Sequence, residues 1–323
     1  MTRVSTAGSY QSALLNLMNA QARATEAQNR VSTQKVATDL VGFGRGAETL
    51  TALKGAQSRV EGFMAAGEAV AARLRAQDLS FERVATAADD ARQSISEALA
   101  SGRLDGLMQA LQGQFFAAQD GLNATHQGRY LFSGGAIETP PIAITTLGDL
   151  ADAPAVADVF VNDTLKSVSR IDEGTTLQTG FLADEVGGAL FEVFRDIQLY
   201  QEGTAVTIDG VTWTPPAAGA IDGQANEDVR AFLASQLGRL ASAHEEITAK
   251  AALNGAMQNR VDTVLGAQDE QALALKELVG DRTEADMAQA VSDLELSQIA
   301  IQASAQVLSS LRGVSLLSLL PMT

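Results

Sequence analysis

A heptad pattern of apolar residues over residues 53–99 restricts the fold more than any other feature of the sequence. Every seventh residue counted from Leu53, and every seventh counted from Ala56, is apolar, with Gly67 and Gln77 as the exceptions. Such a pattern predicts one long helix with a narrow apolar stripe for a partner helix. At 1.5 Å per residue this helix would span roughly 65–70 Å, so we expect a rod instead of a compact globule.

A second stripe of the same period, over residues 233–279, offers the partner. It carries more polar residues, among them His244 and Asn254, and polar seam residues lower stability but can set register. The two stripes predict an antiparallel pair closed within one chain, with the middle of the chain inserted at its tip. The residues expected in this rod seam are Leu53, Val60, Phe63, Val70, Leu74, Phe81, Val84, Ile95, Leu240, Ile247, Val261 and Leu265.

Both ends of the chain also show helical apolar stripes, for which the predicted rod offers no partner. Amphipathic ends of this kind are often disordered until another helix covers them. We therefore expect them to form contacts between subunits. The residues expected there are Leu14, Leu17, Met18, Val31, Leu294, Ile301, Leu308, Leu311, Leu316, Leu317, Leu319 and Leu320.

The middle of the chain differs in character from the rest and begins and ends at proline pairs. Residues 142–146 and 156–161 favour strands, and Asp209-Gly210 between two β-branched runs predicts a two-residue hairpin. An amphipathic helix is expected over residues 189–200. The predicted fold class is thus mainly α, a long antiparallel coiled-coil or helical-bundle rod with a small α+β insertion. The expected divisions are 1–50 (N-terminal helix and loop), 51–139 (first half of the rod), 140–221 (insertion), 222–282 (second half) and 283–323 (C-terminal helix).

The amino-acid composition excludes most kinds of catalytic and metal-binding site. The chain has no cysteine and two histidines, so thiolate sites are excluded and most metal and triad sites lack ligands. The glycine-rich stretch at 42–46 lacks the order of a phosphate loop, and the central acids Asp158, Asp163, Asp172 and Glu173 have no accompanying base or metal set. We therefore predict no enzyme, no catalytic residue, no cofactor and no metal.

The charge and hydropathy of the chain narrow its partners. A formal net charge of −16 argues against nucleic acid and anionic membrane surfaces, which need basic patches. No segment approaches the roughly 18 apolar residues of a membrane span, and the N-terminus does not resemble a cleaved secretory signal. His244 is expected to be a seam histidine with satisfied ring nitrogens.

Several segments at the two ends resemble bacterial flagellins. Residues 253–260 (LNGAMQNR), the acidic turn at 284–288 (EADMA) and the closing serine–leucine run at 315–320 are similar to the C-terminal part of that superfamily. Residues 129–135 (RYLFSGG), together with the opening residues 2–6, most resemble the hook-associated protein 3 family, whose members join the hook to the filament. An aspartate–aspartate–proline segment found in many relatives after the position of Lys35 is missing here, so its loop contact is not expected.

The resemblance implies a structural subunit of the bacterial flagellum, exported through the type III apparatus without a cleaved signal and assembled outside the cell. It implies as partners a hook-associated protein on the hook side, flagellin on the filament side, copies of the chain itself and an export chaperone. Filament flagellin is the near alternative, and a soluble coiled-coil adaptor is the alternative from another class.

Overall fold

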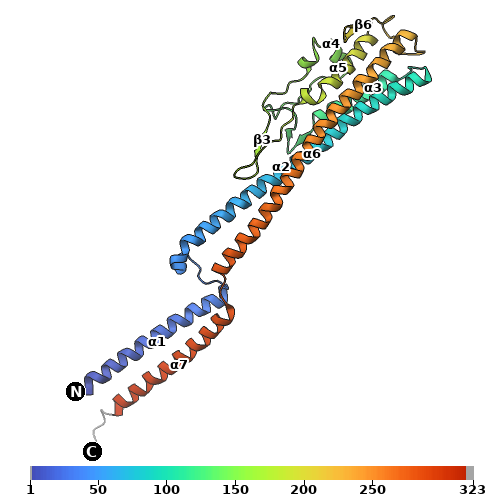
Figure 1. The fold of residues 1–323 in the computed structure, drawn as a ribbon. Helices are drawn as coiled ribbons and strands as arrows, with labels where there is room; N and C mark the ends of the chain where they lie inside the picture. Colours follow the sequence, from blue (N-terminus) through green and yellow to red (C-terminus); the bar gives the residue numbers. More distant parts are fainter. Residues whose placement is uncertain (1, 318–323) are drawn as a thin grey trace, which may run out of the picture. The chain divides into compact units, whose positions relative to one another are not determined.

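The computed structural model describes residues 2–317, with side chains described for residues 8–311. The chain divides into two compact units, which we call the terminal unit (residues 1–60 with 270–323) and the central unit (residues 61–269). Long helices dominate, and the strands form only two-stranded sheets, so the predicted mainly α fold is confirmed (Figure 1). The helices are α1 (Thr2–Thr33), α2 (Ala47–Ser101), α3 (Leu107–Leu122), α4 (Leu147–Asp152), α5 (Ala183–Gln201), α6 (Glu227–Thr283) and α7 (Met287–Leu317), with 3₁₀ turns η1 (Val41–Gly46) and η2 (Val156–Val159).

Within the central unit, α2 and α6 pack antiparallel, and the two predicted apolar stripes lie on these helices. Gly67 of α2 faces Leu265 of α6 so closely that a Cβ on the glycine would lie 2.7 Å from Leu265 Cδ2. Further along, Asn254 Nδ2 donates to the carbonyl oxygen of Leu74 at 2.9 Å. The His244 Nδ1 atom lies 3.1 Å from the carbonyl oxygen of Ala85, which agrees with the expected seam histidine.

From about Phe81 onward the two-helix seam widens into a larger core, because α3 and α5 join α2 and α6 (Figure 1). The Phe115 ring of α3 lies 5.1 Å from that of Phe191 on α5, and Tyr200 of α5 stacks on Phe232 of α6 at 3.9 Å. Phe81 makes edge contacts with Phe132 and Phe181, at 5.4 and 5.0 Å. This part of the predicted seam therefore packs against the middle of the chain as well as against a partner helix.

The middle segment contains three short hairpins and less strand than expected. The hairpins are β1 (Thr125–His126) with β2 (Arg129–Tyr130), β3 (Val168–Arg170) with β4 (Thr176–Gln178), and β5 (Val206–Ile208) with β6 (Val211–Trp213). The hairpin predicted at Asp209-Gly210 is confirmed, and both turn residues have positive φ, as a type I′ turn requires. The helix expected over 189–200 is the longer α5.

The expectation of strands over residues 142–146 and 156–161 is wrong. Only one bridge, between Ile142 and Phe160, joins the two runs. A complete capping box at Thr146 and Asp149 starts α4 directly after the first run, and η2 occupies most of the second. Local side-chain hydrogen bonds to the backbone thus outweigh the strand preference of these short runs.

Polar residues of the two stripes hold the β3–β4 hairpin. Buried Gln77 of α2 donates from Nε2 to the Thr179 carbonyl oxygen at 3.2 Å, and buried Gln268 of α6 donates to that of Ile171 at 2.7 Å. Ile171 itself is buried against Leu74 and neighbouring residues of both helices. The polar interruptions in the heptads therefore position the hairpin, a role that the heptad pattern alone does not reveal.

Candidate subunit interface

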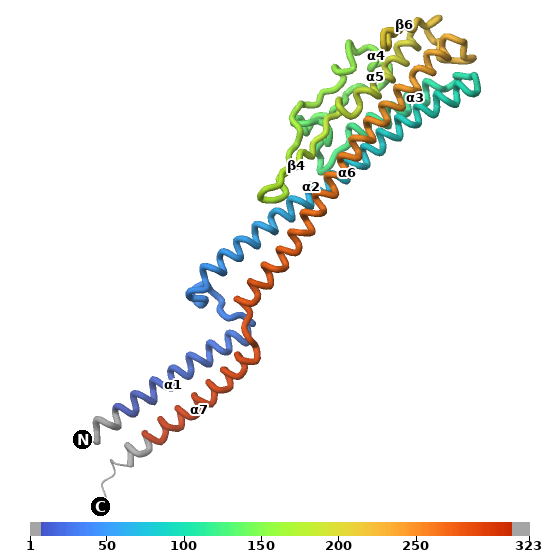
Figure 2. The backbone as a smooth tube through the Cα atoms, in the orientation of Figure 1, coloured from blue at the N-terminus to red at the C-terminus, as the bar shows by residue number. Residues whose placement is uncertain are grey.

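The terminal unit is built on the pairing of α1 with α7 (Figure 2). A short link turns the chain from α6 into α7, and Asp286 caps α7 by accepting from the backbone N–H groups of Ala288 and Gln289, at 2.9 and 3.1 Å. Lys35, just after α1, forms a backbone bridge with Glu284 of this link. The expectation that the terminal stripes have no partner within the chain is therefore wrong, because each terminal helix covers one face of the other.

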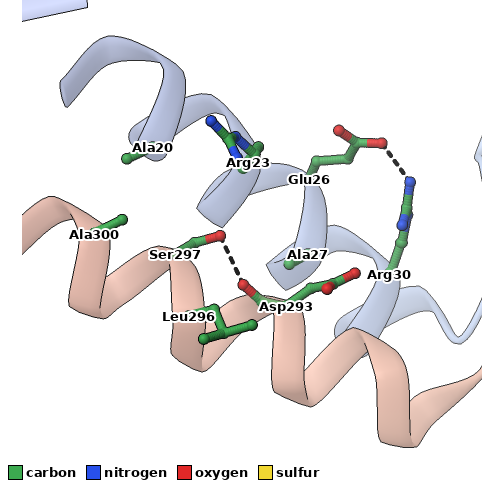
Figure 3. A pocket seen from close by; sticks show the side chains of 9 residues that line it. All are labelled: Ala20, Arg23, Glu26, Ala27, Arg30, Asp293, Leu296, Ser297 and Ala300. Atoms are coloured by element: carbon green, nitrogen blue, oxygen red, sulfur yellow. Dashed lines mark hydrogen bonds and ion pairs between the residues drawn. The ribbon is translucent and has the colours of Figure 1, made fainter. Parts of the chain in front are cut away.

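Small side chains form the contact between α1 and α7. Among the described side chains of α1, the buried ones are Ala13, Ala20 and Ala27, spaced by seven residues. Among those described in α7, the buried ones are Ala290 and Ser297, also seven apart. Figure 3 shows Ala20 and Ala27 facing the side of α7 that carries Ser297, whose hydroxyl donates to the Asp293 carbonyl oxygen at 2.6 Å. Side chains of this size let two helices approach closely but bury little apolar area.

Several large apolar residues of both helices remain exposed. Ile299 lies on the side of α7 away from the buried positions and is 61% exposed. Leu296 lies beside the α1–α7 contact and is 62% exposed. Further exposed apolar residues of the pair include Leu14, Leu15, Met18, Val291 and Val307. We call these seven residues the outer apolar face. Exposed apolar groups on this scale are typical of surfaces that another molecule covers.

The predicted subunit-interface residues fall into three groups. Leu14 and Met18 belong to the outer apolar face. Leu316 and Leu317 belong to α7, but their side chains are outside the described part of the structure. Leu319 and Leu320 lie outside the described residues altogether. The remaining six are partly buried in the α1–α7 pair, namely Leu17, Val31, Leu294, Ile301, Leu308 and Leu311.

Five residues of the outer apolar face were not among those predicted from sequence. Leu15, Leu296, Ile299 and Val307 fall outside the single stripe that a helical period of 3.6 selects, whereas Val291 lies on the stripe but was not chosen from it. The sequence did contain a signal for them, because apolar residues are distributed around all sides of the helix formed by residues 287–311. A helix that is apolar on all sides belongs in the interior of a larger assembly.

The predicted rod-seam residues are all buried or partly buried. Leu53, Phe63, Val70 and Leu265 are partly buried. The buried ones are Val60, Leu74, Phe81, Val84, Ile95, Leu240, Ile247 and Val261.

A shallow groove of about 350 Å³ lies along the α1–α7 contact, where the small side chains leave space (Figure 3). Glu26 and Arg30, one turn apart on α1, form an ion pair of 2.5 Å at its rim, and Arg23 and Asp293 also line it. The groove offers alanine methyl groups at its floor and charges at its edge. Its lining lacks the arrangement of acid, base and nucleophile that catalysis requires.

Other kinds of site find no support in the part of the chain that the structure describes. No three potential metal ligands lie together there. Between residues 2 and 317, none of the helices contains an apolar stretch long enough to cross a bilayer.

The segment 129–135, which carries the resemblance to hook-associated proteins, is a structural strap in the central unit. Phe132 is fully buried, and the Ser133 carbonyl oxygen accepts from the backbone N–H of Asp163 at 3.0 Å. Gly134 has a φ of 66°, and a Cβ there would lie 2.3 Å from the Asp163 carbonyl oxygen. Glycine is required at this position by both conformation and space.

Comparisons with known proteins agree with the sequence resemblance. Residues 237–320 match the family of the bacterial flagellin C-terminal helical region. No curated protein matches the chain as a whole. The fold is similar to that of a Vibrio parahaemolyticus protein described as a flagellar hook-associated protein, with a TM-score of 0.58 and 16% identity over 76% of this chain and 99% of the other.

A second solved structure with this fold is FlgL of Bacillus cereus, with a TM-score of 0.52 and 15% identity over 71% of this chain and 99% of the other. Neither the matched family nor the shared fold is that of an enzyme, in agreement with the prediction of a structural protein. The resemblance to the flagellin superfamily is thereby confirmed. Residues 237–320 are thus similar to the C-terminal helical region of bacterial flagellins, and the chain shares its fold with these two solved structures.

Proposed function

We propose that this chain is a structural subunit of the bacterial flagellum that joins the hook to the filament. The observation that carries the proposal is the outer apolar face. The α1–α7 pair uses its small residues for the internal contact and leaves Leu296, Ile299 and Met18 exposed. Burying these side chains against neighbouring subunits would contribute about 25 cal/mol for each Å² of apolar surface removed from water.

The geometry of the terminal unit suits assembly into a tube. Apolar residues exposed on both α1 and α7 can meet neighbouring subunits, and head-to-tail contacts that do not close generate helical assemblies. A junction subunit would contact a hook-associated protein on one side, flagellin on the other and copies of itself around the ring. The resemblance of residues 129–135 to the hook-associated protein 3 family favours this position over the filament itself.

Export through the flagellar type III apparatus, without a cleaved signal, belongs to the same proposal. A chain without cysteine cannot form wrong disulfides on leaving the cell. The exposed apolar residues of α1 and α7 would aggregate before assembly, so a chaperone that covers these two helices is the expected partner inside the cell.

A substitution on the outer apolar face tests the assembly role. We expect Leu296→Asp to prevent incorporation into flagella, because it places a charge where apolar contacts between subunits form. Leu308 and Leu311 would be poorer choices, since they are partly buried in the α1–α7 pair and their loss would also disturb the monomer. The matched control is Leu79→Asp in the central unit, where the leucine is 67% exposed against 62% for Leu296.

Both variants should retain the helical circular dichroism of the unmodified chain, because neither leucine is buried. Incorporation is measured by quantifying the protein in purified flagella from cells that express each variant. Equal incorporation of the two variants would contradict the assignment of Leu296 to a subunit interface.

Immunogold electron microscopy separates the candidate functions. A junction protein should be labelled only where hook meets filament, and cells lacking it should carry hooks without filaments. Label along the whole filament, together with filament growth by the purified chain alone, would identify a flagellin. Absence of label on the flagellum would leave the soluble adaptor.

A further inference from the structure

A groove of about 280 Å³ in the central unit collects cationic side chains without any carboxylate. It lies between α2 and the β1–β2 hairpin, and Arg73, Arg129 and His126 line it. None of the residues that line it is acidic, although the chain contains 39 acidic against 23 basic residues. A positive site in so acidic a chain is unusual and calls for a ligand of opposite charge.

The two arginines in this groove lack the acidic partners that some other arginines of the chain have. Arg92 pairs with Asp89 at 2.6 Å, and Arg239 pairs with Asp196 at 2.5 Å. Among the residues that the structure describes, Arg73 and Arg129 form neither an ion pair nor a side-chain hydrogen bond. Arg73 is also partly buried, and this burial lowers the pKa of its guanidinium from the usual value.

The β1–β2 hairpin places two of these groups together. His126 and Arg129 are directly opposite each other in the antiparallel register, so their side chains lie on the same face of the hairpin. The turn between them, Gln127-Gly128, has positive φ at both residues, which fixes the register tightly. The His126 Nε2 atom is buried and has no hydrogen-bond partner within the described residues.

Neutral hydrogen-bonding groups complete the groove. Tyr130 and Ser167 line it with hydroxyl groups for which the described part of the chain provides no partner. The apolar side chains of Val70 and Ile137 border the same space. The groove therefore combines two forked cations, several uncharged donors and an apolar wall, as a site for a small polar anion does.

We propose that this groove binds a small oxyanion, a carboxylate or a phosphate, between the guanidinium groups of Arg73 and Arg129. Both oxyanions match the planar, bidentate donor geometry of arginine. A bound anion would supply the counter-charge that partly buried Arg73 lacks in the free chain. This site lies wholly in the central unit and does not depend on the proposed assembly function.

The test uses the full-length chain with inorganic phosphate and with citrate, at constant ionic strength. Each anion is titrated while the melting temperature of the central unit is followed through the fluorescence of Trp213, the only tryptophan. A ligand that binds only the folded state raises this temperature in proportion to its affinity. We expect at least one of the two anions to do so, and the one that binds more tightly identifies the preferred oxyanion.

Arg73→Gln should reduce the affinity at least about tenfold without lowering the melting temperature of the free chain. Arg75→Gln is the matched control, since it removes the same charge from an exposed position two residues along α2 that does not line the groove. Its response to each anion should equal that of the unmodified chain, including the general stabilisation that such salts produce.

Arg129→Gln provides a second variant on a different element, for the case in which Arg73→Gln does not fold. It should also weaken binding about tenfold. An equal rise of melting temperature in the unmodified chain, the groove variants and the control would overturn the proposal, and so would the absence of any rise.

Discussion

The terminal and central units both contain long helices, but different kinds of side chain are buried between those helices. Ten of the eleven phenylalanines and the single tryptophan lie between residues 61 and 269, and Phe43 is the only phenylalanine of the terminal unit. The central unit buries most of its aromatic rings. The α1–α7 pair of the terminal unit buries alanine and serine and exposes several leucine, isoleucine and methionine side chains. One unit has a core of its own, whereas the other leaves its apolar surface available to neighbours.

The largest expected effect concerns the aromatic core of the central unit. Phe115→Ala should destabilise this unit by about 3–5 kcal/mol, because it removes a fully buried ring that lies 5.1 Å from Phe191 and 6.0 Å from Phe194. Trp213 fluorescence during urea unfolding measures the change. The neighbouring Phe116 is 46% exposed, and Phe116→Ala should cost about 1 kcal/mol or less. Similar losses from both variants would refute a core centred on Phe115.

A smaller effect is expected in the close contact of the terminal unit. Ala27→Leu should cost about 1–3 kcal/mol, because the larger side chain does not fit between α1 and α7. Amide hydrogen exchange in α1 and α7 should accelerate, while the urea midpoint reported by Trp213 stays unchanged. Exposed Ala22 provides the control, since Ala22→Leu adds the same side chain outside the contact. If Ala27→Leu leaves exchange unchanged, the contact is looser than described.

The smallest effect is expected at the edge of the aromatic core, where Asp149 caps α4. The backbone N–H of Thr145 donates to this carboxylate, as do the hydroxyl of Thr145 and the backbone N–H of Thr146, and these interactions hold its pKa below the usual value of 3.8. A carboxylate whose pKa is lower in the folded state stabilises the folded chain at pH values above its unfolded-state pKa. This stabilisation is lost as the pH falls through the folded-state pKa.

Asp149→Asn should therefore lower the urea midpoint at pH 7, and its difference from the unmodified chain should shrink below about pH 4. A difference that is the same at pH 7 and pH 3 would show that the charge of Asp149 does not contribute to the cap.

Sequence periodicity predicted the long helices well and their contacts only in part. The stripe over residues 53–99 corresponds to α2, and the stripe over 233–279 corresponds to most of α6. At Phe81, however, the same stripe meets the aromatic rings of the middle segment, because a heptad specifies that a face is apolar without specifying what covers it. Likewise, Gln77 and Gln268 interrupt the apolar stripes, and in the structure both bind the β3–β4 hairpin.

The subunit contacts expected from the sequence and the outer apolar face both lie in the two terminal helices, but the residues chosen from the sequence differ in part from those that are exposed. Placing subunit contacts in the two terminal helices required only that both are apolar and lie at the ends of the chain. Selecting residues failed at Leu296 and Ile299, because the apolar residues of α7 surround the helix and a single stripe covers only some of them. Which side remains free depends on where α1 lies, and that is a tertiary contact.

The sequence by itself determined the helical fold, the hairpin at Asp209-Gly210 and the absence of cysteine chemistry, because these depend on period, local turn geometry and composition. Only the tertiary structure decided that α1 pairs with α7 through alanines and that Arg73 lies in one groove with Arg129. Both contacts join residues far apart in the chain. Local preferences act over a few residues. The packing of whole elements decides which helices approach each other and which side chains line the same groove.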